Sequence, residues 1–373
     1  MNIALVLPHL YFLPDISKQS IFAPGMLFKE LAIGLADKGH QITVFSLDSI
    51  NHKGITNIRG DISYLENEMN KTKLSILDIQ RTHPRTYYNG YKAFQKDLME
   101  KVITYSVKDK FDIIHVFSIN FREILSLPDK VSMPVVYTNH DPYDISRPLK
   151  KAFLEHKKNN YISISNSQRD KVSALNYIST VYNGINPKEF EYNAKPGDYF
   201  ACIGRIIYPK GVHRAIEAAK RAKVKLRIAG KYYSEFGDKY FAEYVKPHID
   251  NKQIIYEGFI KNSKARSDFL KNAKALLFPI NWPEPFGLVM TEALACGTPV
   301  IAFNKGAVPE IVKDGINGYI VEGKDEMASA IKKIDLIDRR VCRDSFMNSF
   351  TSKSMVNGYE KTYDDLIKKK LRP

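Results

Sequence analysis

Short runs of apolar, β-branched and aromatic residues alternate with longer amphipathic segments along the whole chain. The longer segments repeat apolar residues at helical spacing, as Leu27, Leu31 and Leu35 do. Strands that alternate with single helices form parallel sheets covered by helices, so the pattern predicts an α/β fold. Between residues 51 and 85 the pattern is blurred and predicts only short strands and loops.

The chain carries two such series in tandem. A turn-rich segment at Asn183–Pro187 and a polar linker at Tyr192–Asp198 divide them. The second series starts at the strand Tyr199–Ile203 and continues to Ile320. The first series is predicted to contain the strands Asn2–Leu7, Ile42–Phe45, Ile113–Phe117, Val135–Thr138, Tyr161–Ile164 and Ser179–Tyr182 and the helices Met26–Lys38, Tyr91–Lys108, Arg147–Lys158 and Gln168–Leu175.

Composition narrows the class of protein. The chain has 373 residues, 44% of them hydrophobic, which suits two domains with proper cores. It contains no apolar run of membrane-spanning length, and its first residues form a strand rather than a signal peptide. The cysteines (Cys202, Cys296 and Cys342) are widely spaced, which predicts reduced core thiols in a cytoplasmic protein.

The formal net charge is +15, a balance that first suggests nucleic acid as a partner. The lysines, however, are scattered over helix faces, and no helix-turn-helix, zinc-finger or RNA-binding motif accompanies them. We therefore expect no nucleic-acid partner. An anionic membrane, a polyanionic acceptor and a plain solvated surface stay open as explanations of the charge.

Two carboxylates bracket the most informative segment of the chain. Glu284 follows the predicted strand Lys274–Ile280, and Glu292 lies in the predicted apolar helix Leu288–Cys296. Ligands of α/β sheets bind where a strand hands over to a helix, and a helix N-terminus attracts phosphate. Such a site suits a sugar nucleotide, which offers both hydroxyls and phosphates. The plain alternative is that Glu284 caps the helix and Glu292 is solvated on its outer face.

A second loop has the composition of a diphosphate site. Gly204–Gly211 follows the first strand of the second series and precedes the predicted helix Val212–Ala222. Its two cations, Arg205 and Lys210, would neutralise a diphosphate, and arginine can bind one with two hydrogen bonds. The alternative is a basic surface turn. The chain contains no Asp-x-Asp motif, which agrees with an enzyme that needs no metal.

The string from Pro279 to Glu310 resembles the signature of retaining glycosyltransferases of family 4, the group 1 family with the GT-B fold. The resemblance covers nearly the whole chain and is strongest over residues 200–321. It implies an α/β fold of two Rossmann-like domains facing across a cleft, with the C-terminal helix crossing back to the first domain. The expected domains are 1–190 plus about 352–373, on the acceptor side, and 195–350, which binds the nucleotide sugar.

The resemblance also implies roles for single residues. Arg205 and Lys210 would hold the donor diphosphate, together with the backbone at the start of the predicted helix that carries Glu292. Glu292 would hold the ribose, and Glu284 and His140 would be the catalytic residues beside the donor sugar. The remaining donor-binding residues implied by the family pattern are Gly204, Phe286, Gly287, Leu288, Gly230 and Phe259.

Two positions depart from the family pattern. Phe22 and Ala23 stand where the family commonly has a Gly-Gly pair before its first helix, and Gly306-Ala307 replaces a second such pair. Because the first loop normally approaches the diphosphate and the acceptor, this departure puts the acceptor contacts in doubt.

The implied activity is retaining, metal-independent transfer of a hexose from a nucleoside-diphosphate sugar, a UDP-sugar in preference to a GDP-sugar. No cofactor is expected beyond that co-substrate. The acceptor would be a glycan, a lipid-linked sugar or a small molecule, and the enzyme would be cytoplasmic or peripheral on the inner face of the membrane. A sugar-nucleotide epimerase, a phosphorylase and a non-catalytic nucleotide-sugar-binding module remain as alternatives.

Overall fold

The computed structural model describes residues 1–13, 16, 22–117, 119, 121–143, 146–232 and 234–371. The chain forms two compact units. Unit 1 comprises Met1–Ile164, Arg169–Val181 and Met355–Pro373, and unit 2 comprises Ser165–Gln168 and Tyr182–Ser354. Each unit is built on a parallel sheet of its own, which confirms the predicted fold of two Rossmann-like α/β units. The predicted limits of independently folding domains stay predictions.

The sheet of unit 1 has the strand order β3-β2-β1-β4-β5-β6-β7, and all described pairs are parallel. Its central strands are apolar on both faces because helices cover both. The order reverses between β1 and β4, which places a topological switch point there. The strands are β1 (Asn2–Val6), β2 (Gln41–Ser46), β3 (Ile55–Arg59), β4 (Ile113–Phe117), β5 (Val135–Thr138), β6 (Asn160–Ser163) and β7 (Tyr177–Thr180).

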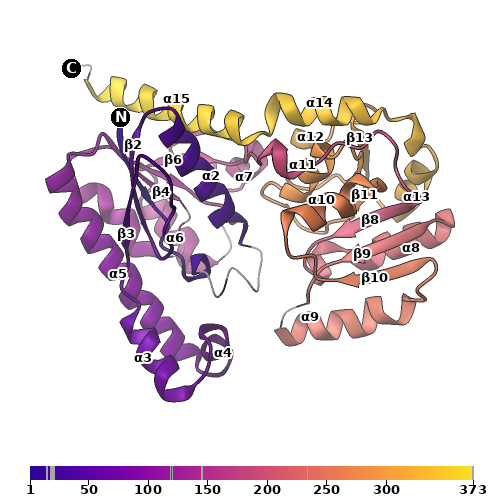
Figure 1. Ribbon diagram of the computed structural model, residues 1–373, viewed down its shortest axis with the longest axis horizontal. Coiled ribbons are helices and arrows are strands. Elements are labelled where there is room, and N and C mark those ends of the chain that lie inside the picture. The colour runs from indigo at the N-terminus through magenta and orange to yellow at the C-terminus, as the bar shows by residue number, and fades with distance from the viewer. Residues whose placement is uncertain are drawn as a thin grey trace. The chain divides into compact units, whose positions relative to one another are not determined.

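The prediction for residues 51–85 was wrong apart from one strand, because the structure has two helices there. These helices, α3 and α4, lie at one end of the long helix α5 (Figure 1). Leu65 is the one buried residue of α3, so the apolar stripe was too thin to be recognised. The described helices and 3₁₀ segments are η1 (Leu10–Phe12), α2 (Ala23–Asp37), α3 (Ser63–Thr72), α4 (Ile76–Thr82), α5 (Pro84–Asp109), η2 (Arg122–Asp129), α6 (Arg147–Glu155), α7 (Asn166–Asp170) and α15 (Ser352–Leu371).

Helix α15 packs against unit 1, as predicted for the terminal helix. Its residues Met355, Tyr359 and Tyr363 are buried. The Tyr363 hydroxyl lies 2.6 Å from Nδ1 of His115, which belongs to β4. The last helix of the chain therefore completes the core formed by the first strands (Figure 1).

Unit 2 repeats the architecture with the strand order β10-β9-β8-β11-β12-β13, again parallel. Its switch point lies between β8 and β11. Helix α8 packs against α13, and α11 packs against α10 and α14. The elements are η3 (Pro187–Glu189), β8 (Tyr199–Ile203), η4 (Tyr208–Lys210), α8 (Val212–Ala222), β9 (Lys225–Ala229), α9 (Ser234–Tyr240), the π-helix η5 (Phe241–Val245), η6 (Lys246–His248), β10 (Ile254–Gly258), α10 (Ser263–Lys271), β11 (Ala273–Phe278), α11 (Leu288–Ala295), β12 (Val300–Phe303), α12 (Val308–Ile311), β13 (Gly318–Val321), α13 (Lys324–Lys332), η7 (Ile334–Leu336) and α14 (Arg339–Ser349).

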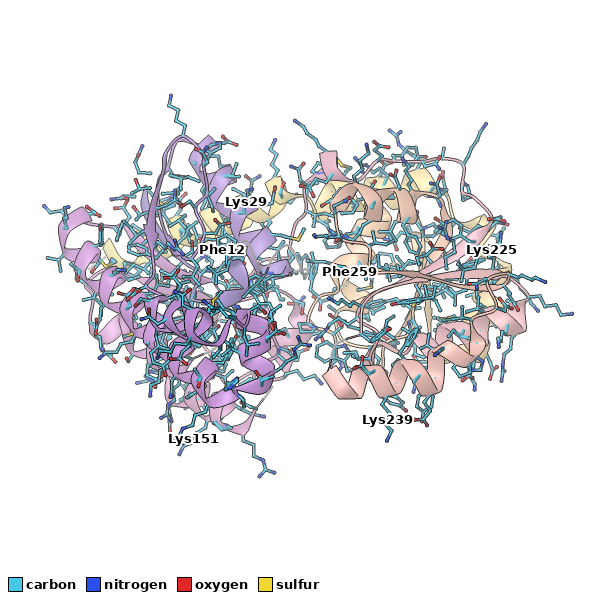
Figure 2. The ribbon with its side chains drawn as sticks, turned by 60° about the horizontal axis from the view of Figure 1, so that its bottom comes forward. Phe12, Lys29, Lys151, Lys225, Lys239 and Phe259 are labelled. Atoms are coloured by element: carbon cyan, nitrogen blue, oxygen red, sulfur yellow. The ribbon has the colours of Figure 1, made fainter. Side chains whose placement is uncertain are left out.

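Lysine side chains point outward, and the cysteines are buried and free, as the sequence predicted for the thiols. Lys151 and Lys239 carry their side chains away from the ribbon of their own units (Figure 2). Cys202, Cys296 and Cys342 are buried and free, and burial raises the pKa of each thiol to about 12. No helix among the described parts of the chain combines the length and apolarity needed to cross a membrane.

Candidate active site

The loops that follow β8 and β11 meet at the switch point of unit 2. The backbone N–H of Asn281 donates to the carbonyl of Pro209 at 2.7 Å. A Cβ on Gly211 would lie 2.0 Å from the carbonyl oxygen of Pro279, and its φ of +69° is left-handed. Only glycine fits here, so the diphosphate loop predicted from the sequence is pressed against the loop that carries Glu284.

The structure brings Lys210 and Glu284 into direct contact. Nζ of Lys210 lies 2.5 Å from Oε2 of Glu284, and the two side chains are 15% and 13% exposed. Nε1–H of Trp282 donates to the same oxygen at 2.8 Å. Nζ of Lys210 also lies 5.3 Å from the centre of the Trp282 ring, within cation–π range. A predicted catalytic carboxylate and a predicted donor-binding cation thus form one cluster with Trp282, a residue to which the sequence assigned no role.

The backbone of Glu284 packs closely against a glycine. A Cβ on Gly306 would lie 2.3 Å from both the nitrogen and the carbonyl oxygen of Glu284. The N–H of Ala307 donates to that carbonyl at 3.0 Å. The pair Gly306-Ala307 therefore keeps a glycine at the position where this close approach requires it.

Among the described residues, the Glu284 carboxylate accepts hydrogen bonds from Lys210 and Trp282 and from no amide of helix α11, so the alternative that Glu284 caps this helix was wrong. The first residue before the helix, Gly287, has a φ of +89°. Phe286 is buried, and its ring packs at 6.1 Å from those of Tyr182 and Phe350. The amides at the start of α11, including that of Leu288, are the groups that could bind an anion.

Glu292 is buried rather than solvated, so the other half of that alternative was also wrong. It is 7% exposed and forms two hydrogen bonds with Arg266 of α10, from Nη2 at 2.9 Å and from Nε at 3.3 Å. Burial raises the pKa of the Glu292 carboxyl, and the Arg266 guanidinium opposes that shift. The ribose-binding role of Glu292 remains a prediction.

Sequence reasoning missed Arg266, although a signal existed. Arg266 shares a buried helical stripe with Phe269 and Leu270, and a charged residue on such a stripe is rarely buried without a partner. The identity of that partner could not be read from the pattern.

The neighbouring strand ends of unit 2 carry the predicted glycines. The N–H of Gly204 donates to Ala229 at 3.0 Å, and that of Gly230 donates to Gly258 at 2.8 Å. A Cβ on Gly230 would lie 1.9 Å from the carbonyl oxygen of Gly204. Gly230 is thus required by the close approach of two strand ends, and its contact with a donor remains a prediction.

The other two predicted donor-binding residues of this unit make few contacts. Arg205 is exposed, and no ion pair joins it to the part of the chain that the structure describes. Phe259 is half-buried, and Nζ of Lys231 lies 5.9 Å from the centre of its ring. The structure does not bring either residue to the cluster of Lys210, Trp282 and Glu284 through a contact.

His140 belongs to unit 1, where it follows β5. Both its ring nitrogens are buried without a hydrogen-bond partner among the described residues, and its ring lies 4.4 Å from that of Phe117. Burial lowers the pKa of His140 to about 3, so the ring is neutral at physiological pH. A buried polar atom with no partner is unusual in a folded protein, and a ligand hydroxyl would supply one.

The first loop of unit 1 is aromatic where the family pattern has glycines. Phe22 is the residue before α2, and its ring lies 4.4 Å from that of His9. Burial lowers the pKa of His9 to about 4, so this group is also neutral at physiological pH. Phe22 therefore adds bulk and apolar surface at the end of β1.

Among the residues that the structure describes, no group of three or more His, Cys, Asp or Glu side chains could hold a metal ion. The charged groups near the switch point of unit 2 are arranged as pairs instead, Lys210 with Glu284 and Arg266 with Glu292.

Comparison with known proteins agrees with this geometry. Residues 25–189 match the family Glycosyltransferase Family 4, and residues 186–344 match Glycosyl transferases group 1. An uncharacterised glycosyltransferase of Methanocaldococcus jannaschii is 25% identical over 91% of this chain and 90% of its own length.

Solved structures show the same fold. The sucrose-phosphate synthase of Thermosynechococcus elongatus superposes with a TM-score of 0.73 at 17% identity, covering 99% of this chain and 100% of that one. The Anabaena protein HepE in complex with UDP-glucose gives a TM-score of 0.68 at 15% identity, covering 98% and 100%. With the switch-point cluster and the two sequence matches together, the chain belongs to the group 1, family 4 glycosyltransferases of GT-B fold and transfers a sugar from a nucleotide sugar.

Proposed function

We propose that this glycosyltransferase moves a hexose from a UDP-sugar to a carbohydrate or lipid-linked acceptor, with retention of configuration and without a metal. The contact between Lys210 and Glu284 carries the proposal. A cation for the diphosphate and a carboxylate for the sugar lie side by side, at the switch point where α/β sheets bind ligands.

The leaving diphosphate would be neutralised by side chains and backbone together. Lys210 and the exposed Arg205 supply positive charge, and the uncapped amides at Gly287 and Leu288 add hydrogen-bond donors at a helix start. This arrangement would replace the metal ion that other enzymes use to bind a diphosphate. Transfer should then survive excess EDTA, and complete loss of activity that manganese restores would refute metal independence.

Polar side chains would hold the sugar and the ribose. Glu284 would bind sugar hydroxyls and stabilise the positive charge that develops at the anomeric carbon. Glu292 would hold the ribose, with its partner Arg266 fixing the orientation of the carboxylate. His140 would offer a neutral ring nitrogen to a hydroxyl, which its unpartnered state supports.

Retention would follow from attack on the same face from which the diphosphate leaves. The bond between the anomeric carbon and the phosphate oxygen breaks, and the acceptor oxygen forms the new bond on that face. The acceptor's proton passes to the departing phosphate oxygen, so no separate base is needed. Product analysis of the anomeric configuration tests this step, and an inverted product would refute it.

The choice of a UDP-sugar is supported by HepE, which has been crystallised with UDP-glucose. A thermal-shift screen of UDP-, GDP- and ADP-sugars tests it, because a ligand that binds only the folded protein raises the apparent stability. We expect the largest shift with a UDP-sugar. A larger shift with a GDP-sugar would overturn the choice of base and leave the rest of the proposal standing.

The epimerase and the phosphorylase make different predictions. Donor alone should be stable with this enzyme apart from slow hydrolysis, and consumption should accelerate when an acceptor is added. Interconversion of the donor without acceptor would indicate an epimerase. Consumption that requires inorganic phosphate would indicate a phosphorylase.

A further inference from the structure

Trp282 contacts both charged members of the cluster at once. Its indole N–H donates to Oε2 of Glu284 at 2.8 Å, and its ring centre lies 5.3 Å from Nζ of Lys210. The edge of an indole ring is electropositive and its face is electronegative. Trp282 therefore presents the favourable side to each partner.

The loop that carries Trp282 is itself anchored. The preceding residue, Asn281, donates its backbone N–H to the carbonyl of Pro209 at 2.7 Å, and its Oδ1 accepts from Nη1 of Arg214 at 3.2 Å. The backbone next to Trp282 is therefore anchored, so the indole can restrain the Glu284 side chain.

The hydrogen bonds leave one oxygen of Glu284 available. Lys210 and Trp282 both bind Oε2. Among the described residues, no hydrogen bond is made to Oε1, so this oxygen can meet a ligand hydroxyl. When Lys210 turns toward a phosphate, the indole N–H is the donor that remains on Glu284.

We propose that Trp282 is a positioning residue for sugar transfer: it fixes Glu284 against the donor sugar while Lys210 engages the diphosphate. The inference rests on the proposed function and adds to it a residue that acts through Glu284. It predicts that the loss of the indole N–H impairs events at the transferred sugar and spares the binding of UDP, which lacks that sugar.

The first test compares Trp282→Phe with wild type in four measurements: kcat, KM, affinity for UDP and affinity for UDP-glucose. Because a hydrogen bond to a charged group is lost, we expect kcat to fall roughly 10- to 100-fold. The affinity for UDP-glucose should fall, and the affinity for UDP should stay within about twofold. Unchanged kcat in Trp282→Phe would overturn the proposal.

A matched control separates positioning from loss of stability. The hydroxyl of Tyr199, at the start of β8, donates to the carbonyl of Phe269 at 2.6 Å. Tyr199→Phe therefore removes another aromatic hydrogen-bond donor from unit 2, away from the cluster. It should lower the melting temperature and leave kcat unchanged. An equal fall of kcat in both variants would mean that Trp282 has only a structural role.

The double variant Trp282→Phe/Glu284→Gln tests whether Trp282 acts through Glu284. If it does, the double variant should be no slower than Glu284→Gln alone, because residues that act as a unit are not additive. Two effects that multiply would overturn the proposal.

A measurement on the unaltered side chain removes dependence on the folding of a variant. The chain has a single tryptophan, so isotope-labelled protein gives one indole N–H resonance. UDP should shift this resonance in the wild type, and Glu284→Gln should shift it without ligand. An indole resonance that responds to neither would overturn the proposal, whereas a response to UDP without turnover of any sugar nucleotide would instead refute the proposed function.

Discussion

The two units share one architecture, but two histidines of the first and two glutamates of the second are compensated in opposite ways. In unit 1, His115 and the ring nitrogens of His140 are buried without a charged partner, and burial lowers the pKa of each histidine to about 3. In unit 2, Glu284 and Glu292 are held against the cations Lys210 and Arg266. Desolvation disfavours a charge unless an opposite charge compensates it. The same sheet topology can therefore present a neutral surface or a charged one, depending on which partners the helices supply.

This difference supports the roles proposed for these residues. A diphosphate needs cations and oriented amides, which unit 2 has near its switch point, whereas a hydroxyl needs neutral donors and acceptors, which unit 1 has at His140. The charged pairs and the neutral histidines should therefore respond differently to substitution.

The largest effect is expected at the buried pair of Glu292 and Arg266. Glu292→Gln leaves the guanidinium of Arg266, which is 4% exposed, without a counter-charge. Loss of one partner of a buried ion pair costs about 3–5 kcal/mol, and we expect a fall in the free energy of unfolding of that size. Urea unfolding measures it. The exposed pair of Lys151 and Glu155 provides the control, because Glu155→Gln should change stability little.

Lys210→Ala should weaken UDP binding by about 1.5–3 kcal/mol, the scale of a hydrogen bond to a charged group. Calorimetric titration measures the affinity. Lys225→Ala is the matched control, since Lys225 lies at the start of β9 and pairs with Asp198. Equal affinities of Lys210→Ala and wild type would remove the diphosphate loop from the proposed site.

His115 should make the fold sensitive to acid. Its pKa is about 3 in the folded protein and 6.5 ordinarily, so between these values the unfolded chain binds the extra proton and stability falls as the pH is lowered. From neutral pH to about pH 5 the loss from this residue is ~2 kcal/mol. His115→Gln should shrink the difference in unfolding free energy between the two conditions by that amount. His83→Gln, at an exposed histidine, should not.

The smallest effect is expected at His140, the neutral counterpart of the charged pairs. His140→Ala should lower kcat by about fivefold, in line with the loss of one neutral hydrogen bond worth about 1 kcal/mol. The affinity for UDP should not change, because only the sugar end is disturbed. A fall in UDP affinity with kcat preserved would place His140 at the nucleotide instead. It would then contradict the proposed role of His140 at the sugar.

The strands and the loops that carry chemistry could be predicted because their signals are local. Val135–Thr138 and Tyr199–Ile203 were predicted with the bounds that β5 and β8 have in the structure. Both are runs of buried residues bounded by turn residues. The helices α3 and α4 could not be predicted, since each is short and buries little, so that contact with α5 rather than an apolar stripe stabilises them.

The sequence by itself determined the α/β class, the division into two series, the glycine-bounded loop with Arg205 and Lys210, and the two glutamates. Each depends on residues that are near one another in the chain. Tertiary structure alone decided the partners. Lys210 meets Glu284 across 74 positions, and His115 meets Tyr363 across 248. Whether a buried group keeps its charge is set by the group that packs against it, and such contacts are fixed only when the helices dock on their sheets.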